Sequence, residues 1–307
     1  MEKKIHFYWG NSNMSWLRYM TIESFVKHNP DWRVVLTLDK STTSKNKWSD
    51  ENKQDFFNYE GEDYTSSIDS LGVEIRTWEP ELVPAANRTE VLENGSFFTN
   101  VPGDMDLDVP RVPELSTPSH RSNFFKWYTL ATEGGVYSDM DIIFTAPIGD
   151  NWACIDSHDA TLCWDDGYYL IGFMASQGDS ELFSKIYKSA HIIFDEKKYQ
   201  SVGQAALLYS IANNPNIEYT YSDILQYFNG AETVFLFDPN LVYPVRYGEI
   251  ARIFPGSDDE CSIPASSIGV HWFGGCAPGQ VFNNQVSREN FLDKPCALSS
   301  ALKKGII

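Results

Sequence analysis

Residues 121–144 read RSNFFKWYTLATEGGVYSDMDIIF, and this stretch is the most informative in the chain. Its first half predicts a helix that runs into Gly134-Gly135, and its second half predicts a short strand that presents Asp139 and Asp141. Side chains two residues apart on a strand point to the same face, about 6–7 Å apart. Two carboxylates so placed can share a Mg²⁺ or Mn²⁺ ion, which leaves coordination positions for substrate phosphates. The stretch therefore predicts chemistry on a nucleotide diphosphate.

The residues on either side of the acidic pair favour a functional role for it. Two acids with one residue between them are common by chance, but these lie between Val136-Tyr137 and the apolar run Ile142-Ile143-Phe144. A solvated surface fits this context poorly. Open α/β sheets bind ligands beyond the carboxyl ends of their strands, so we expect the pair at such an edge.

The 307-residue chain is rich in aromatic residues and strongly acidic, with a formal net charge of -18. This charge argues against a nucleic-acid partner, because phosphate contacts supply most of that affinity. No stretch has the character of a signal peptide or the length of a membrane span, and the five cysteines form no Cys-x-x-Cys pair. These features predict a cytoplasmic protein with no membrane span.

Strand and helix patterns alternate along the chain and predict an α/β fold with a buried parallel sheet. A strand at 4–9, a helix that stops at His28-Asn29-Pro30 and a strand at 33–38 form one βαβ unit. Within one domain spanning 1–307, we expect a long surface loop at 93–118 and a helical elaboration at 176–235. Further strands are expected at 73–78, 160–164, 168–175 and 268–273, and helices at 179–194 and 202–213.

The centre of the chain contains Ser122-Asn123-Phe124-Phe125-Lys126, Gly134-Gly135-Val136-Tyr137 and Asp139-Met140-Asp141. With their gaps, these motifs resemble the Ser-Asp-x-x-Arg, Gly-Gly-x-Tyr and Asp-x-Asp motifs of glycosyltransferase family 32, whose sugar-binding region contains a DXD motif. They are also similar to the glucosyltransferase domains of the large clostridial toxins. Segments near both ends resemble the opening strand and C-terminal landmarks of these families: Ile5 to Gly10, Val242-Tyr243-Pro244 and His271-Trp272.

The resemblance implies a GT-A fold, which is a Rossmann-like, mostly parallel mixed sheet with helices on both faces. It also implies metal-dependent transfer of a sugar from a nucleotide sugar, with uridine as the expected nucleoside, to a glycan or another hydroxyl acceptor. Retention of anomeric configuration and Mn²⁺ or Mg²⁺ as cofactor follow from the same resemblance. Asp139 and Asp141 are the implied catalytic residues. Asp141 would coordinate the metal directly, while Asp139 would bind the ribose or sugar and assist the metal.

Three further residues belong to the implied site. The resemblance makes His271 a metal or phosphate contact, although a histidine at a strand end is often structural. It makes Trp9 a stacking partner for uracil, although a tryptophan on a first strand usually belongs to the core. Tyr137 joins the donor-binding residues.

The central helix departs from the family pattern. Asn123 and Lys126 stand where the family has the Asp and Arg that hold the donor, and lysine cannot give the bidentate fork of arginine. Either both still bind the donor, with Arg121 taking over some contacts, or this helix face is solvated. Asp165 and Asp166 are candidate acceptor contacts, or else part of an exposed turn.

Two other functions stay open at this point. The departures on the central helix also suit a catalytically silent module that binds a sugar nucleotide or a glycan. A nucleotide-sugar hydrolase is the second alternative, because many transferases pass sugar to water and the sequence identifies no acceptor. Turnover separates the binding module from the enzymes, and dependence of turnover on added glycan separates transferase from hydrolase.

Overall fold

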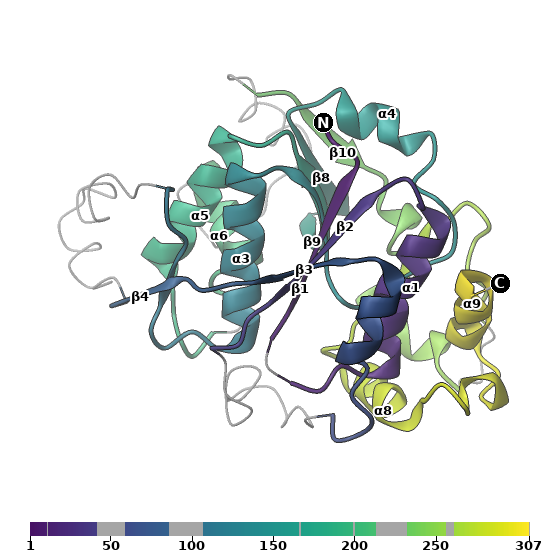
Figure 1. Cartoon of the computed structure of the whole chain (residues 1–307). Helices are drawn as coiled ribbons and strands as arrows, with labels where there is room; N and C mark the ends of the chain where they lie inside the picture. The colour runs from purple at the N-terminus through teal and green to yellow at the C-terminus, as the bar shows by residue number, and fades with distance from the viewer. Residues whose placement is uncertain are drawn as a thin grey trace.

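The computed structural model describes residues 1–10, 12–41, 59–85, 107–165, 167–198, 200–212, 232–255 and 261–306. In this part of the chain a seven-stranded sheet with the order β10-β8-β9-β6-β1-β2-β3 forms the centre (Figure 1). The strands are β1 (Lys4–Trp9), β2 (Arg33–Leu38), β3 (Glu74–Thr77), β4 (Glu81–Val83), β5 (Arg111–Pro113), β6 (Gly135–Ser138), β7 (Ile142–Phe144), β8 (Ala160–Asp165), β9 (Tyr168–Ser176), β10 (Val234–Phe237) and β11 (Gly269–His271). The α-helices are α1 (Trp16–His28), α3 (Pro118–Thr132), α4 (Asn151–Asp156), α5 (Glu181–Ile193), α6 (Gln204–Ala212), α8 (Ala277–Gln285) and α9 (Ala297–Ile306). The 3-10 helices are η1 (Thr65–Leu71), η2 (Pro239–Leu241), η3 (Tyr247–Ile253) and η4 (Phe291–Asp293).

Pairing in the large sheet is mostly parallel. β1 lies parallel to β2 and β6, β3 is parallel to β2, and β10 is parallel to β8. Only β9 is antiparallel to its neighbours, β6 and β8, among the described strands of this sheet. Helix α1 joins β1 to β2, because parallel neighbours need a crossover connection. The predicted α/β class and the predicted βαβ unit are confirmed.

Helices cover both faces of the sheet (Figure 1). Side chains alternate along a strand, so Ile5 and Phe7 of β1 belong to the apolar cluster that includes α1 and α9. Tyr8 points the other way, into the cluster formed with α3, α5 and α6. Since β1, β2 and β6 run parallel, their carboxyl ends share one edge of the sheet. A ligand site is expected at that edge.

Helix α3 places its first turns beside this edge. It begins at Pro118, where the Thr117 side chain accepts the N–H of His120 and satisfies a donor of the first turn. After the helix the chain reverses at Gly134, whose φ is 65°. A Cβ at this position would lie 2.4 Å from the backbone nitrogen of Gly178, so the reversal requires glycine. The helix therefore returns antiparallel to β6, with its N-terminal end near the carboxyl end of that strand.

The expectation that Asp139 and Asp141 lie on one strand is wrong. β6 ends at Ser138, β7 begins at Ile142, and the three residues between them form a turn. The physical reason is a change of partner. β6 pairs with β1 and β9 in the large sheet, whereas β7 pairs with β11 in a separate two-stranded sheet, and the chain must turn to pass from one to the other.

The structure describes only part of the expected loop at 93–118 and of the expected helical elaboration at 176–235. Residues 93–106 lie outside the described residues, and the rest of the expected loop contains β5 and the start of α3, so it is more regular than predicted. Helices α5 and α6 confirm the helices predicted at 179–194 and 202–213, while 213–231 lie outside the described residues. In the described part of the chain, no helix is both long and apolar enough to cross a bilayer.

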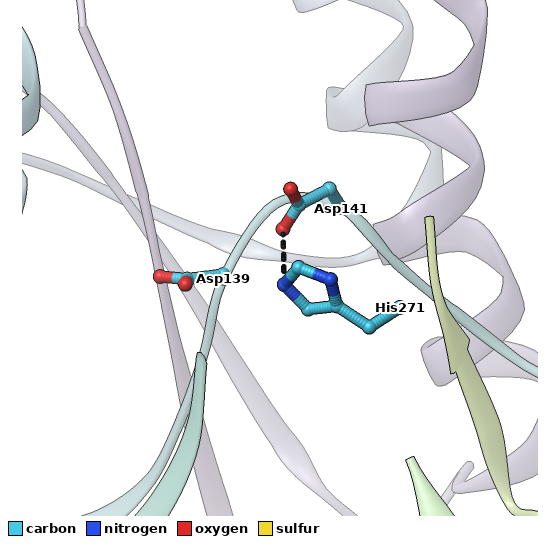
Figure 2. Close-up of side chains that lie close together, drawn as sticks. All are labelled: Asp139, Asp141 and His271. Atoms are coloured by element: carbon cyan, nitrogen blue, oxygen red, sulfur yellow. Dashed lines mark ion pairs between the residues drawn. The ribbon is translucent and has the colours of Figure 1, made fainter. Parts of the chain in front are cut away.

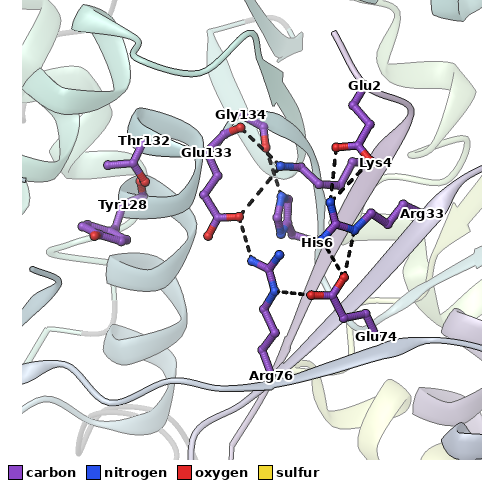
Figure 3. Close-up of polar contacts among 10 residues, drawn as sticks. All are labelled: Glu2, Lys4, His6, Arg33, Glu74, Arg76, Tyr128, Thr132, Glu133 and Gly134. Carbon is purple, nitrogen blue, oxygen red and sulfur yellow. Dashed lines mark hydrogen bonds and ion pairs between the residues drawn. The ribbon is translucent and has the colours of Figure 1, made fainter. Parts of the chain in front are cut away.

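In the first half of β1, a buried histidine lies in a cluster of charged groups (Figure 3). The Nε2 atom of His6 is 3.0 Å from the carbonyl oxygen of Gly134, while its Nδ1 is buried without a hydrogen-bond partner among the described residues. Burial lowers the pKa of His6 to about 4, and the positive charges of Lys4 and Arg76 act in the same direction against Glu133. The ring is therefore neutral in the folded protein at pH 7.

We expect His6 to make the protein less stable in mild acid. Its pKa is lower in the folded than in the unfolded chain, so stability falls as pH drops below about 6.5 and levels off near pH 4. Between pH 7.5 and pH 5 this amounts to about 2 kcal/mol. Urea unfolding of the wild type and of His6→Gln at both pH values measures it. The variant, whose amide can still donate to Gly134, should lose less stability, and equal losses would contradict the assignment.

Candidate active site

A turn at the carboxyl edge of the sheet brings three side chains together. Asp139 follows β6, Asp141 precedes β7, and His271 is the last residue of β11, which pairs with β7. One ligand atom from each of the three lies within 4.8 Å of the other two (Figure 2). The turn thus places one ligand atom of each side chain where the three could hold a single ion.

Asp141 is buried and held from several sides. The N–H of Gly274 donates to its Oδ2 at 2.8 Å, the Nε2 of His271 is 3.1 Å from its Oδ1, and the Arg18 guanidinium is 3.8 Å from Oδ2. Burial alone would raise the pKa of Asp141, but these three groups outweigh it and hold the pKa below its ordinary value. Asp141 is therefore an ionised, fixed carboxylate.

Asp139 is held mainly through one oxygen. Tyr137 donates its hydroxyl to Oδ1 at 3.0 Å, and the ammonium of Lys126 is 3.2 Å from the same atom. The backbone N–H of Asp139 donates to the carbonyl of Gly172 at 2.7 Å. A Cβ on Gly172 would lie 2.9 Å from Oδ2, so the missing side chain keeps space beside this second oxygen.

The central helix faces the site, and the solvated alternative is wrong. Lys126 is 1% exposed and Asn123 is 8% exposed. Lys126 also donates to the carbonyl of Ile171 at 2.8 Å, which fixes its ammonium between β9 and Asp139. Burial lowers the pKa of Lys126, while the charges of Asp139 and Asp141 act against this shift. Asn123 lines the same cavity.

His271 is both packed and directed at the acids. Its ring stacks on Tyr243 at a centroid distance of 4.9 Å, and its Nδ1 accepts the N–H of Phe273 at 3.2 Å. Because Nδ1 is an acceptor, the neutral ring carries its hydrogen on Nε2 and directs it to Asp141. Coordination of a metal by Nε2 would require this hydrogen to leave that atom. The same geometry therefore fits His271 as a packed structural residue and as a metal ligand.

A cavity of about 1550 Å³ opens over these residues. Its described lining contains six carboxylates and four cationic side chains, so it is negative before any ligand enters. Trp9 lines it from the end of β1, with its Nε1 donating to the carbonyl of Ser12 at 2.8 Å. The predicted site residues on its wall are Trp9, Asn123, Lys126, Tyr137, Asp139, Asp141, Asp165 and His271.

The remaining predicted residues are placed differently. Arg121 is buried and forms a two-pronged ion pair with Asp39, with Nε 2.6 Å from Oδ2 and Nη2 3.2 Å from Oδ1. Asp39 lines the cavity whereas Arg121 is absent from its described lining, so Arg121 acts on the cavity wall through Asp39. Asp165 also lines the cavity, paired with Arg246. Asp166 lies outside the described residues.

Arg18 and Gly172 belong to the site although the sequence analysis did not single them out. The Arg18 guanidinium lies over the rings of Trp9, at 5.5 Å from the centroid, and Trp272, at 4.7 Å. A signal for Arg18 did exist, because it is a charged residue inside the otherwise apolar run from Trp16 to Met20. Gly172 gave no signal, since a glycine within a strand has no side chain to indicate its neighbours.

The three clustered residues fit a hard divalent cation. Two carboxylates and an imidazole nitrogen are ligands that Mn²⁺ accepts, and Mg²⁺ is bound through one or two carboxylates. Both acids are oriented by neighbouring donors, as ligands at metal sites usually are. Gly172 leaves open space where a side chain would contact Asp139 and His271.

Comparison with known proteins bears on the class of the protein. Residues 18–158 match the family described as "Glycosyltransferase sugar-binding region containing DXD motif", which confirms the predicted resemblance and the predicted enzyme class, a glycosyltransferase. No curated protein matches the chain.

Three solved structures illustrate the similarities found. The PaToxG glycosyltransferase is 14% identical, with 74% of this chain and 73% of that one covered and a TM-score of 0.45. The galactosyltransferase LgtC, in complex with donor and acceptor sugar analogues, is 12% identical, with coverages of 94% and 98% and a TM-score of 0.41. The glycosyltransferase GlyE of Streptococcus pneumoniae TIGR4 is 8% identical, with coverages of 100% and 61% and a TM-score of 0.43.

Proposed function

We propose that this glycosyltransferase transfers the sugar of a nucleoside diphosphate sugar, with uridine as the nucleoside, to a hydroxyl acceptor with retention of configuration, and releases the nucleoside diphosphate. Mn²⁺ or Mg²⁺ is the proposed cofactor. The observation that carries the proposal is the convergence of Asp139, Asp141 and His271 inside a large cavity. A cytoplasmic location and a single domain remain predictions from the sequence.

The charge of the cavity favours a cation. Carboxylates outnumber cationic side chains six to four on its described wall, and Arg18, Lys126 and Arg246 already pair with acids of that wall. A diphosphate would add further negative charge in a partly enclosed space, where repulsion is strong. A divalent cation held by Asp139, Asp141 and His271 would offset this charge and stabilise the leaving diphosphate.

The protein's own groups orient the site. Gly274, Arg18 and His271 hold the Asp141 carboxylate in its ionised form. Tyr137 and Lys126 hold one oxygen of Asp139 and leave the other beside Gly172. Lys126 supplies a compact positive charge where the family has an arginine, so a donor hydroxyl or phosphate would meet a point charge and not a planar fork.

We expect Trp9→Ala to weaken uridine diphosphate binding. Trp9 ends β1 at the cavity wall, and stacking of a base on an aromatic ring is worth about 1–3 kcal/mol. Isothermal calorimetry with uridine diphosphate and Mn²⁺ measures the loss, expected at about 5- to 150-fold in Kd. Trp152→Ala is the control, because Trp152 lies on α4 away from the described cavity lining. Unchanged affinity in a folded Trp9 variant would assign Trp9 to the core.

A donor screen tests the function as a whole. The protein is incubated with a panel of nucleotide sugars and Mn²⁺, and free nucleoside diphosphate is measured with and without glycan acceptors. Release that increases with an acceptor supports transfer. Release that is equal with and without every acceptor tested supports the hydrolase. Nucleotide binding without any release supports the silent module and overturns the proposal.

A further inference from the structure

Two exposed tyrosines distinguish the rim of the cavity. Among the described residues seven large hydrophobic side chains are exposed, and the two aromatic ones are Tyr168, at 63%, and Tyr247, at 61%. Both line the cavity of the active site. Leaving a large aromatic ring in water costs free energy, so exposed aromatic groups gathered at a cavity often mark a binding surface.

An ion pair links the segments that carry these tyrosines. Tyr168 is the cross-strand partner of Asp165 where β8 turns into β9, and Arg246 directly precedes Tyr247. The Nε of Arg246 is 2.5 Å from Oδ2 of Asp165, and its Nη2 is 3.0 Å from Oδ1. This two-pronged contact ties the β8–β9 hairpin to the segment before η3. The two tyrosines therefore stand on the same part of the rim.

Aromatic contacts connect this rim to the proposed metal cluster. The ring of Tyr247 packs edge-on against Phe273 at a centroid distance of 5.5 Å, and Phe273 packs against His271 at 4.2 Å. Arg246 also donates to the carbonyl of Tyr243, whose ring stacks on His271. A molecule resting on the tyrosines would lie next to the reacting end of a donor bound at the cluster.

The chemistry of this rim suits a sugar ring. A pyranose presents C–H groups on one face and hydroxyls around its edge. An exposed tyrosine offers an apolar face and a hydroxyl, and the Asp165–Arg246 pair offers both an acceptor and donors beside it. Trp9, the aromatic group predicted to hold the base, is 8% exposed and lies at the end of β1. Tyr168 and Tyr247 are therefore available to a second substrate.

We propose that Tyr168, Tyr247 and the Asp165–Arg246 pair form the acceptor subsite, and that the acceptor is a glycan whose sugar ring packs on the tyrosines. This inference rests on the proposed function, since it takes the cluster to hold the donor. Asp165 then has two roles. Its ion pair with Arg246 holds the two segments of the rim together, and its carboxylate can accept a hydrogen bond from an acceptor hydroxyl.

A glycan array tests the inference. Labelled wild-type protein is applied with uridine diphosphate and Mn²⁺, and glycan retention is compared with that of Tyr168→Ala and Tyr247→Ala. We expect at least one glycan to be retained by the wild type and retention to fall at least about 10-fold in each variant, because the apolar contact with the ring is lost. This fall should exceed any loss of uridine diphosphate affinity measured on the same preparations. Tyr→Phe variants at both positions, which keep the rings, should retain the glycan.

The controls separate the possible failures. Leu82→Ala removes another exposed apolar side chain, from β4 and outside the described cavity lining, and should leave retention unchanged. Retention of no glycan by the wild type, or equal retention by the alanine variants, overturns the acceptor subsite. Nucleotide release from the donor panel tests the proposed function independently. Release without glycan retention overturns only the subsite, whereas retention without release overturns transfer and with it the acceptor role of the rim, leaving a glycan-binding surface.

Discussion

Asp141→Asn should abolish turnover while leaving the protein folded. The substitution keeps the shape of the side chain, and the amide oxygen can still accept the N–H of Gly274. It removes the ionised oxygen that a cation would need, so kcat/KM for nucleotide release should fall at least about 100-fold. The melting temperature should also fall, because the buried Arg18 guanidinium and the His271 ring lose the charge of Asp141, so folding is checked separately by circular dichroism. Release of nucleoside diphosphate at a series of Mn²⁺ concentrations measures the effect.

Glu60→Gln is the matched control for this prediction. Glu60 also lines the cavity and carries the same charge, but it is exposed and lies outside the cluster of three. It should retain turnover within about 3-fold, because an exposed charge acts weakly over distance. A chelator should inhibit the wild type, and added Mn²⁺ should restore it. Near-normal turnover of Asp141→Asn at saturating donor and limiting Mn²⁺ would contradict the metal role.

Gly172→Ala should inactivate the enzyme through a single methyl group. A Cβ at this position would lie 2.7 Å from the Tyr243 hydroxyl, 2.9 Å from Oδ2 of Asp139 and 3.2 Å from Nε2 of His271. Because all three atoms would have to shift, the cluster would open and kcat should fall at least about 100-fold. Overpacking should also cost about 1–3 kcal/mol of stability. Steady-state kinetics and urea unfolding measure the two effects separately.

Gly248→Ala provides the comparison. Gly248 lines the same cavity, but a Cβ there would meet no atom within 4 Å. Activity and stability should therefore stay close to those of the wild type. If Gly172→Ala were equally active, the geometry around Asp139 would not matter for turnover. If both variants were inactive, any added methyl group in the cavity would inactivate the enzyme, and the specific contacts of Gly172 would not be the reason.

Local patterns predicted the elements of the fold well, because each is specified by neighbouring residues. The strand at Lys4–Trp9, the helix that ends at His28 and the strand at Arg33–Leu38 have the expected bounds. The turn at Asp139-Met140-Asp141 was missed because it depends on pairing between β7 and β11, which are more than 120 residues apart. An acidic residue between two apolar runs carries no information about such a distant partner.

The sequence pointed to the two acids of the candidate site but not to the contacts of the residues around them. The motif containing Asp139 and Asp141 lies on the wall of the cavity. The burial of Lys126 could not be predicted from the sequence, because a lysine on an amphipathic helix is exposed unless another segment covers it. In this fold β9 covers Lys126, which donates to the carbonyl of Ile171. Arg18 was missed although its charge within an apolar run was a signal, because that signal does not identify the distant Trp272 as its neighbour.

The contacts of Asp141 with the segment 271–274 also bear on synthesis of the chain. Its side chain bonds to Gly274, its carbonyl accepts the N–H of Trp272, and its nearest imidazole is that of His271. A nascent chain therefore emerges from the ribosome with β1, α1, β2, α3 and β6 long before these groups exist to complete the cluster. Contacts of such sequence separation form late in folding. Any affinity for a cation that needs the whole cluster would accordingly appear only after the 271–274 segment has been translated and has docked.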